Sequence, residues 1–479
     1  MALTLGDIVA ATGGRLLKGS AEHEVRGIST DSRSVRSGDL FFAIRGKKHD
    51  GHRFVSAALD NGACGAVVEV FIDDVYRDIY REQAGRDQAV GGDRRRGSNI
   101  VVVGDTLRAL GDLASFIRKR HGVPLVAVGG SSGKTTTKEM IASILSRSMD
   151  VLKTPGNMNN LVGLPLTLAA LKSSHEVCVV ELGISEPGEM KRLAAICRPD
   201  IAVITNIGTA HLEGFGSVER IRSEKMELYS SLRPGGVRVV NIDEPWVSVL
   251  MDDEGIESVT FGRTGGADVV IKDFSTEETD GISVDYEVRG RRIRVRFRSP
   301  LFSNTYNGAA SIAAVLPLEA DIVDIREGLE AFSPPGGRME VIRAGEWTIL
   351  DDTYNANPDS VVAALKTLGA AKGRKVAVLG DMLELGELTL DAHRDIGEFA
   401  AGSGIDLLIA VGRWAEVVGD GAVTAGMGKD RVYSFEGNEE TLDALRSLLK
   451  EGDTVLVKGS RSTRMEEVVE GLIRSKRRR

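Results

Sequence analysis

The sequence predicts an α/β protein of three domains in which mostly parallel sheets are covered by helices. The chain has 479 residues, which suggests about three domains at roughly 150 residues each. Short apolar runs alternate with helical stretches along most of the chain, a pattern typical of parallel sheets covered on both faces. A Gly-rich segment ending in Gly-Lys-Thr directly follows one of these runs, which favours a nucleotide-binding central domain.

Composition limits the classes of partner. The net charge is -8, so we expect no nucleic-acid partner. No apolar run approaches the ~20 residues that a membrane helix needs, and the first residues lack a signal-peptide pattern. The protein is therefore not expected to be embedded in a membrane. The three cysteines have no metal-like spacing, which favours free thiols in a reducing compartment.

The first domain is predicted over residues 1–105, with a polar surface insertion over 71–98. The insertion interleaves acidic and basic residues, which argues against a nucleic-acid patch. Strands are expected at 39–44, 63–70 and 99–103, with a helix over 54–61.

The second domain is predicted over 106–317 and the third over 318–479, with Pro317 near the boundary. Strands of the second are expected at 123–128, 177–180, 201–205 and 237–241, followed by an antiparallel appendage over 269–297. Strands of the third are expected at 348–350, 376–379, 407–411 and 454–457. Several of these end in Gly, which predicts a Rossmann-like sheet with a ligand crevice at its strand ends. The basic tail 476–479 is expected to be a solvated end.

The Gly-rich segment after the strand at 123–128 is predicted to bind phosphate. Glycine lets backbone N–H groups converge on a phosphate, Lys134 can neutralise the β- and γ-phosphates, and Thr135 can ligate Mg²⁺. A Gly-rich turn with an exposed lysine is the alternative. The expected nucleotide-binding residues are Gly130, Ser131, Ser132, Gly133, Lys134, Thr135 and Thr136.

Two further residues follow predicted parallel strands, and so should lie at the same sheet edge. Glu181 and His211 could hold a second divalent ion there, although a cap and a hydrogen-bonded histidine are equally ordinary interpretations. Lys225 lies in Glu-Lys-Met-Glu on a predicted helix, and pattern alone favours an exposed, solvated position.

Polar segments occur at two other places. Asp351 and Asp352 end a predicted strand and could contact ribose hydroxyls, metal-bound water or an amine, whereas the following 353–358 could simply form a turn. Ser29 to Arg33 offers hydrogen-bonding groups for a polar ligand, or again a turn.

These segments, in this order, resemble the Mur ligases of bacterial cell-wall synthesis over nearly the whole chain. The resemblance implies a UDP-sugar-binding first domain, ATP and Mg²⁺, and a carbamylated Lys225 that joins Thr135, Glu181 and His211 as a metal ligand. It places Asn304 and Asn307 near adenine and adds Arg338 and Asp352 to the nucleotide site. Lys134, Lys225, Glu181 and His211 would be catalytic. The substrate-binding residues it implies are Ser29, Asp31, Ser32, Arg33, Asn157, Asn160, Asn355 and Asn357.

The segment Tyr354–Pro358 is typical of the dipeptide-adding branch of this family. The diamino-acid-adding branch shows Tyr-Ala-His-Thr-Pro and Asp-Asn-Pro-Arg motifs, and neither occurs here. The resemblance thus implies a cytoplasmic, monomeric bacterial enzyme that joins D-alanyl-D-alanine to UDP-N-acetylmuramoyl-tripeptide through an acyl phosphate. Open alternatives are the diamino-acid-adding ligase, a folylpolyglutamate-synthetase-like ligase and an inactive ATP-binding scaffold. The sequence departs from the family pattern at Gly129, Phe302 and Ser303.

Overall fold

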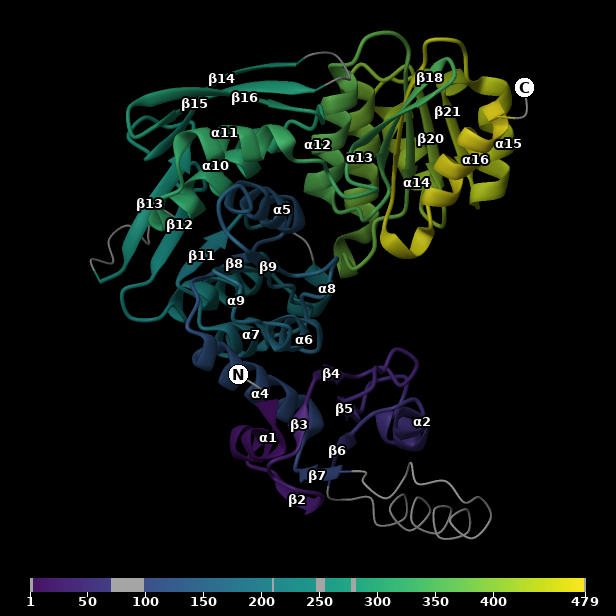
Figure 1. The fold of residues 1–479 in the computed structure, drawn as a ribbon. Helices are drawn as coiled ribbons and strands as arrows, with labels where there is room; N and C mark the ends of the chain where they lie inside the picture. The colour runs from purple at the N-terminus through teal and green to yellow at the C-terminus, as the bar shows by residue number, and fades with distance from the viewer. Residues whose placement is uncertain (1–2, 70–98, 209–210, 247–254, 277–280, 478–479) are drawn as a thin grey trace. The chain divides into compact units, whose positions relative to one another are not determined.

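The computed structural model describes residues 3–69, 99–208, 211–246, 255–276 and 281–477 (Figure 1). The predicted insertion over 71–98 and the last two residues of the basic tail lie outside the described residues. The chain forms two compact units, one made of 1–125, 150–182 and 191–199 and the other of 126–149, 183–190 and 200–479.

The first unit contains an N-terminal sheet in the order β2-β7-β6-β5-β4, in which β4 to β7 are parallel and β2 is antiparallel. Because the strands are parallel, β4, β5 and β6 end at one edge. The elements are β1 (Leu3–Thr4), α1 (Leu5–Thr12), β2 (Arg15–Lys18), β3 (Glu24–Val25), β4 (Gly27–Ser29), β5 (Asp39–Phe42), η1 (Gly51–Phe54), α2 (Val55–Asp60), β6 (Gly65–Glu69), β7 (Asn99–Val103) and α4 (Thr106–His121). The unit also holds β9 (Val151–Lys153), α6 (Gly163–Ala169), β10 (Val177–Glu181) and most of α7 (Glu189–Cys197). Strands β9 and β10 pair in parallel.

The helices of this sheet begin and end at residues suited to caps. Thr4 and Asp7 form a capping box at α1, and Gly13 ends the helix with φ 64°. Asp105 accepts from the backbone N–H of Arg108 at the start of α4, and Gly122 ends that helix with φ 65°. Local sequence therefore sets the limits of both helices.

The second unit carries the central strands in the order β16-β15-β14-β13-β12-β11-β8. Strands β8 and β11 to β14 are parallel, and β14 to β16 form the predicted antiparallel appendage. The elements are β8 (Leu125–Gly129), α5 (Lys134–Leu145), β11 (Ile201–Ile204), α8 (Leu212–Phe215), α9 (Val218–Ser230), β12 (Val237–Asn241), β13 (Glu257–Gly262), β14 (Val269–Thr276), β15 (Ile282–Val288), β16 (Arg291–Phe297), α10 (Asn304–Val315), η3 (Leu316–Leu318) and α11 (Ile322–Ala331).

The same unit ends in a sheet of order β17-β18-β22-β19-β20-β21, parallel except for β17. Its elements are β17 (Glu340–Ala344), β18 (Trp347–Asp352), α12 (Pro358–Gly369), β19 (Lys375–Gly380), η4 (Gly386–Leu388), α13 (Thr389–Gly402), β20 (Leu407–Val411), α14 (Ala415–Thr424), η5 (Lys429–Arg431), β21 (Val432–Phe435), α15 (Asn438–Leu448), β22 (Thr454–Lys458), η6 (Arg461–Thr463) and α16 (Glu466–Arg477).

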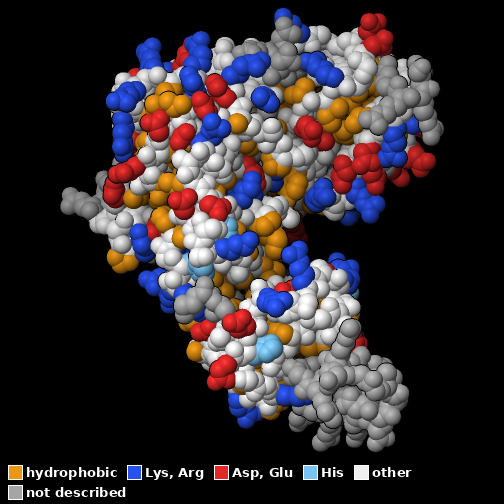
Figure 2. Space-filling view, in the orientation of Figure 1, with side chains coloured by type: hydrophobic (Ala, Val, Ile, Leu, Met, Phe, Trp, Pro, Cys, Tyr) orange, Lys and Arg blue, Asp and Glu red, His pale blue; other side chains and the backbone are white. Residues whose placement is uncertain are grey.

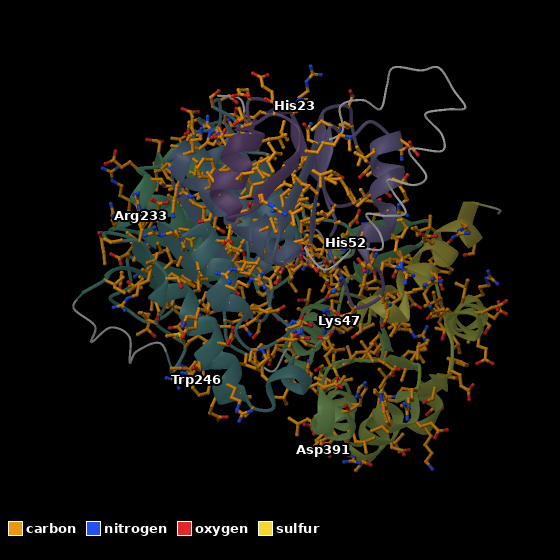
Figure 3. All side chains as sticks on the ribbon, turned by 90° about the horizontal axis from the view of Figure 1, so that it is seen from below. His23, Lys47, His52, Arg233, Trp246 and Asp391 are labelled. Atoms are coloured by element: carbon orange, nitrogen blue, oxygen red, sulfur yellow. The ribbon has the colours of Figure 1, made fainter. Side chains whose placement is uncertain are left out.

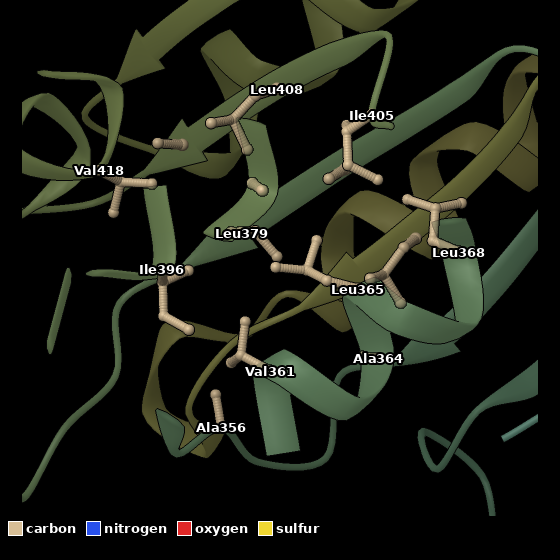
Figure 4. Packing of buried hydrophobic residues seen from close by; sticks show 14 of the residues in the cluster. Ala356, Val361, Ala364, Leu365, Leu368, Leu379, Ile396, Ile405, Leu408 and Val418 are labelled. Carbon is tan, nitrogen blue, oxygen red and sulfur yellow. The ribbon is translucent and has the colours of Figure 1, made fainter. Parts of the chain in front are cut away.

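Alternate residues of these C-terminal strands build two cores. Ala377 and Leu379 of β19 pack with α12, α13 and α14 on one face (Figure 4). Val376 and Val378 face the other way and pack with α15 and α16. Strand side chains alternate with period two, so a strand buried on both faces is apolar throughout. This confirms the mostly parallel sheet, covered on both faces, that the apolar runs predicted.

The surface carries charges of both signs. Acidic and basic side chains are interspersed on the face seen in Figure 2, so no single-sign patch dominates that view. Among the described residues, no helix has the length and apolar character needed to cross a membrane.

Candidate functional site

The segment after β8 forms a phosphate-type loop at the start of α5. Gly130 and Gly133 have φ of 136° and 79°, and Gly133 is the residue that begins the helix. A Cβ on Gly130 would lie 2.0 Å from Oγ1 of Thr205, so only glycine fits there. The N-terminus of α5 favours an anion at this point. Lys134 extends over the loop, and its Nζ donates to the backbone oxygen of Gly130 at 2.9 Å.

The two residues after β11 form hydrogen bonds with this loop. The backbone N–H of Ser132 donates to Oδ1 of Asn206 at 2.9 Å, and that of Ser131 donates to the Asn206 carbonyl at 3.0 Å. Oγ1 of Thr205 donates to the Ser132 carbonyl at 2.5 Å. Thr205 and Asn206 were not among the predicted site residues, although both follow a strand that ends beside the loop.

Lys225 of α9 is buried, which makes the exposed position favoured by its charge pattern wrong. Its side chain is 1 % exposed, and its Nζ donates to Oγ of Ser131 at 3.0 Å. Burial disfavours the charged ammonium, and repulsion from Lys134 adds to this, so the pKa of Lys225 is lowered to about 7. Tertiary packing thus places a partly neutral amine beside the phosphate loop.

Arg338 reaches the same loop from the segment before β17. Its Nη2 donates to Oγ1 of Thr135 at 2.9 Å, and its guanidinium lies 3.9 Å from the ring centroid of Tyr354. The structure therefore brings together Arg338 and Thr135, both predicted for the nucleotide site.

His211 lies at the start of α8 with φ 65°, and its Nδ1 is 2.5 Å from Oε2 of Glu384. Glu384 also has a positive φ, of 64°. The hydrogen bond with His211 lowers the pKa of the Glu384 carboxyl. Two non-glycine residues in the left-handed region at one contact indicate a conformation maintained by the surrounding fold.

The two aspartates at the end of β18 have different partners. Oδ1 of Asp351 accepts from the hydroxyl of Thr353 at 2.6 Å, and burial raises the pKa of Asp351. Oδ2 of Asp352 accepts from Nζ of Lys458 at 2.5 Å, and the same Nζ donates to the Asn355 carbonyl at 2.9 Å. Lys458 was not predicted as a site residue, and its place at the end of the adjacent strand β22 is the signal that could have found it.

Asn357 begins α12 and also contacts the phosphate loop. Its Oδ1 accepts from the backbone N–H of Ser360 at 2.9 Å, and its Nδ2 donates to Oγ of Ser132 at 3.2 Å. Oδ1 of Asn355 accepts from the backbone N–H of Arg461 at 3.4 Å. The amides predicted to meet an incoming amine therefore have protein partners here, and that substrate role stays a prediction.

The predicted adenine residues lie on α10. Asn307 is buried, and its side chain lies close to the phosphate loop. A Cβ added to Gly133 would lie only 2.4 Å from Oδ1 of Asn307. Asn304 is 2 % exposed, and its Oδ1 has no hydrogen-bond partner among the residues that the structure describes. A buried acceptor without a partner is unusual, and it fits a ligand donor such as an exocyclic amine. Phe302, where the sequence departs from the family pattern, packs edge-on against Phe274 with centroids 5.0 Å apart.

In the first unit, Glu181 is the buried last residue of β10. Its Oε1 accepts from Nδ2 of Asn159 at 2.8 Å, a partner that the sequence analysis missed although it predicted Asn157 and Asn160. Oδ1 of Asn160 accepts from the backbone N–H of Gly163, the first residue of α6, at 2.9 Å. Asn157 is exposed.

The predicted UDP-sugar residues lie at the end of β4 and just after it. Ser29 ends the strand, and its Oγ donates to the Asp31 carbonyl at 3.0 Å. The side-chain hydrogen bond from Arg33 lowers the pKa of Asp31 to about 2. Asn61 donates to the carbonyl of Ser32 at 2.8 Å.

His52, labelled in Figure 3, ties the neighbouring loop to this sheet. Its Nδ1 is 2.6 Å from Oδ1 of Asp50, and its Nε2 accepts from the backbone N–H of Glu69 at 3.1 Å. An imidazole that donates at Nδ1 and accepts at Nε2 is neutral, so this arrangement fixes one tautomer.

Across the described ranges, no group of three or more His, Cys, Asp and Glu side chains is close enough to hold a metal ion. The predicted set of Thr135, Glu181, His211 and Lys225 includes a threonine and a lysine, and it stays a prediction.

Three family models match successive parts of the chain. Residues 24–118 match the Mur ligase family catalytic domain, 128–315 the Mur ligase middle domain, and 337–461 the Mur ligase glutamate ligase domain. The order is that of the three predicted domains, whose boundaries at 105 and 317 remain predictions.

Relatives match over the full length. UDP-N-acetylmuramoyl-tripeptide–D-alanyl-D-alanine ligase of Treponema pallidum is 38% identical over 100% of both chains. The crystal structure of MurF from Acinetobacter baumannii superposes with a TM-score of 0.88 at 32% identity, covering 99% of each chain. MurF from Thermotoga maritima, solved in complex with ADP, has a TM-score of 0.80 at 31% identity, covering 95% of this chain and 98% of that one. Identity and coverage of this extent show common descent, and the chain belongs to the Mur ligase family.

Proposed function

We propose that the chain is an ATP-dependent ligase that adds D-alanyl-D-alanine to UDP-N-acetylmuramoyl-tripeptide in peptidoglycan precursor synthesis. The observation that carries this proposal is the contact between the phosphate loop and the segment typical of the dipeptide-adding branch, where Asn357 donates to Oγ of Ser132 at 3.2 Å. The full-length relative of Treponema pallidum named for this reaction supports it.

The reaction has two steps. The terminal carboxylate of the tripeptide attacks the γ-phosphorus of ATP, giving an acyl phosphate and ADP. The free amine of D-alanyl-D-alanine then attacks the acyl carbon, and phosphate leaves as the amide forms. Carboxylate and phosphate are both anionic, so neutralisation by Lys134 and Arg338 is the main contribution expected of the protein.

Mg²⁺ is the proposed cofactor, held by Thr135, Glu181, His211 and a carbamylated Lys225. The lowered pKa of Lys225, about 7, supports the last of these because it leaves neutral amine at neutral pH. A neutral amine adds CO₂ and releases a proton, which converts a cation that cannot ligate a metal into an anion that can. The ion would screen the charge on the transferred phosphoryl group. We also propose that the enzyme acts as a monomer, since the proposed site residues all come from one chain, and that it acts in the cytoplasm.

The test is phosphate release with ATP, Mg²⁺ and a panel of amines. D-Ala-D-Ala with the muramoyl tripeptide nucleotide should be the productive pair, and L-Ala-L-Ala, L-lysine and meso-diaminopimelate should be poor. Productive turnover of the muramoyl dipeptide with a diamino acid would show the diamino-acid-adding ligase instead. Nucleotide binding without turnover of any pair would show an inactive scaffold.

A further inference from the structure

Tyr354 contacts two arginine side chains. The guanidinium carbon of Arg338 lies 3.9 Å from the centroid of the Tyr354 ring, and that of Arg461 lies 5.8 Å away. A guanidinium within about 6 Å of an aromatic ring centroid is attracted by the ring quadrupole, and the attraction weakens with distance. The contact with Arg338 is therefore the stronger of the two.

The backbone on either side of Arg338 is also fixed against this segment. The backbone N–H of Tyr354 donates to the Gly337 carbonyl at 2.9 Å, and Gly337 has φ 72°. Met339 has φ 55° although it is not a glycine, and its side chain is fully buried in the adjacent core. A non-glycine residue keeps such a conformation only where the surrounding structure imposes it. The main chain at Arg338 is thus determined from both sides.

The direction of the Arg338 side chain decides what its charge can reach. Nη2 of Arg338 donates to Oγ1 of Thr135, in the phosphate loop, at 2.9 Å. Arginine has several flexible torsions, and a ring stacked on the guanidinium removes part of that freedom before a ligand arrives. The Tyr354 ring therefore restricts a cation that points at the phosphate loop.

We propose that Tyr354 is a positioning residue for nucleotide binding, because its ring holds the guanidinium of Arg338 against the phosphate loop. The inference rests on the proposed function and extends it. The family resemblance alone links Tyr354 to the identity of the incoming amine. Its contacts in the structure indicate instead that it affects the binding of ATP.

The experiment compares Tyr354→Leu with Tyr354→Phe in the full chain. Affinity for a non-hydrolysable ATP analogue with Mg²⁺ is measured by titration calorimetry without either other substrate. Tyr354→Leu should weaken binding about fivefold or more, the usual size of one such contact, while Tyr354→Phe keeps the ring and should stay within about twofold. In turnover assays, Tyr354→Leu should raise the KM for ATP and leave the KM for D-Ala-D-Ala nearly unchanged.

A matched control is Tyr433→Leu, which removes a tyrosine ring from β21 of the C-terminal sheet. Tyr433 stacks on Phe435, with ring centroids 6.4 Å apart. Its replacement by leucine should leave nucleotide affinity unchanged. Pairing Tyr354→Leu with Arg338→Met should give less than the sum of the two single losses, since both remove one contact.

Unchanged nucleotide affinity in Tyr354→Leu, or a rise confined to the KM for the amine, would overturn the inference. The binding measurement does not depend on which amine is ligated. A wild-type chain that binds the analogue but does not ligate D-Ala-D-Ala would therefore count against the proposed function alone.

Discussion

Nζ of Lys225 and Oγ of Ser131 are 3.0 Å apart, which links a buried helix lysine to the phosphate loop. The same Oγ accepts from the backbone N–H of Gly208 at 2.7 Å. The loop is thus connected on one side to the segment after β11 and on the other to α9. A change in the charge of Lys225 acts directly at a residue that should contact phosphate.

Lys225→Ala should be inactive, and a short carboxylate such as formate or acetate should restore part of the activity by replacing the carbamate. The pKa of Lys225 lies at about 7 instead of its ordinary 10.5, so the amine is neutral above pH 7 and protonated below it. Because only the neutral amine takes up CO₂, wild-type activity should fall as the pH drops through about 7. A pH–rate profile checks this, and the rescued variant should lack that acid limb. Full activity of Lys225→Ala without added carboxylate would contradict the role.

Lys134→Ala should abolish measurable turnover and leave the thermal midpoint of the ligand-free protein nearly unchanged. Lys134 is half-buried and contacts loop carbonyls, whereas the core of this unit is formed by other residues. Loss of one group that stabilises transition-state charge typically costs on the order of 100- to 1000-fold in rate. Phosphate release and differential scanning fluorimetry on the same preparation separate the two effects. Turnover near the wild-type rate would refute the assignment.

Asn357 offers a way to separate helix capping from the contact with the loop. Asn357→Ala removes both and should destabilise the fold by about 1 kcal/mol. Asn357→Ser keeps a capping oxygen for the backbone N–H of Ser360 but removes the amide that donates to Ser132. The serine variant should therefore keep the thermal midpoint and lose turnover. If it retains full activity, the contact between Asn357 and Ser132 has no part in the reaction.

The apolar strands were predictable because strands buried on both faces are continuous in sequence. Leu407–Val411 and Val237–Asn241 have the predicted limits. Short or half-exposed strands carry no such signal. Strand β2, Arg15–Lys18, alternates exposed and half-buried residues with a basic residue at each end, and it was not predicted.

Much of the candidate site could be chosen from sequence, but its contacts could not. The Gly-Lys-Thr pattern predicts a loop by local geometry. Lys225 lies between two glutamates in a pattern typical of an exposed helix, and only tertiary packing buries it. The contact between His211 and Glu384 joins residues 173 positions apart, and no periodicity encodes it. Family resemblance supplied roles for residues whose positions only the fold determines.

The pair of Lys458 and Asp352 should couple strongly in stability. Their side chains are 3 % and 12 % exposed, and Nζ lies 2.5 Å from Oδ2. Removing one partner of a buried pair leaves the other charge without compensation, at a cost of about 3–5 kcal/mol, whereas removing both is often close to neutral. Lys458→Met and Asp352→Asn should therefore each lower the thermal midpoint, and the double variant should recover most of the loss. Strictly additive losses would mean that the pair does not form in solution.

Lys458 also donates to the Asn355 carbonyl at 2.9 Å. The double variant should therefore regain stability but not turnover, since the loop that carries Tyr354 would still lack this hydrogen bond.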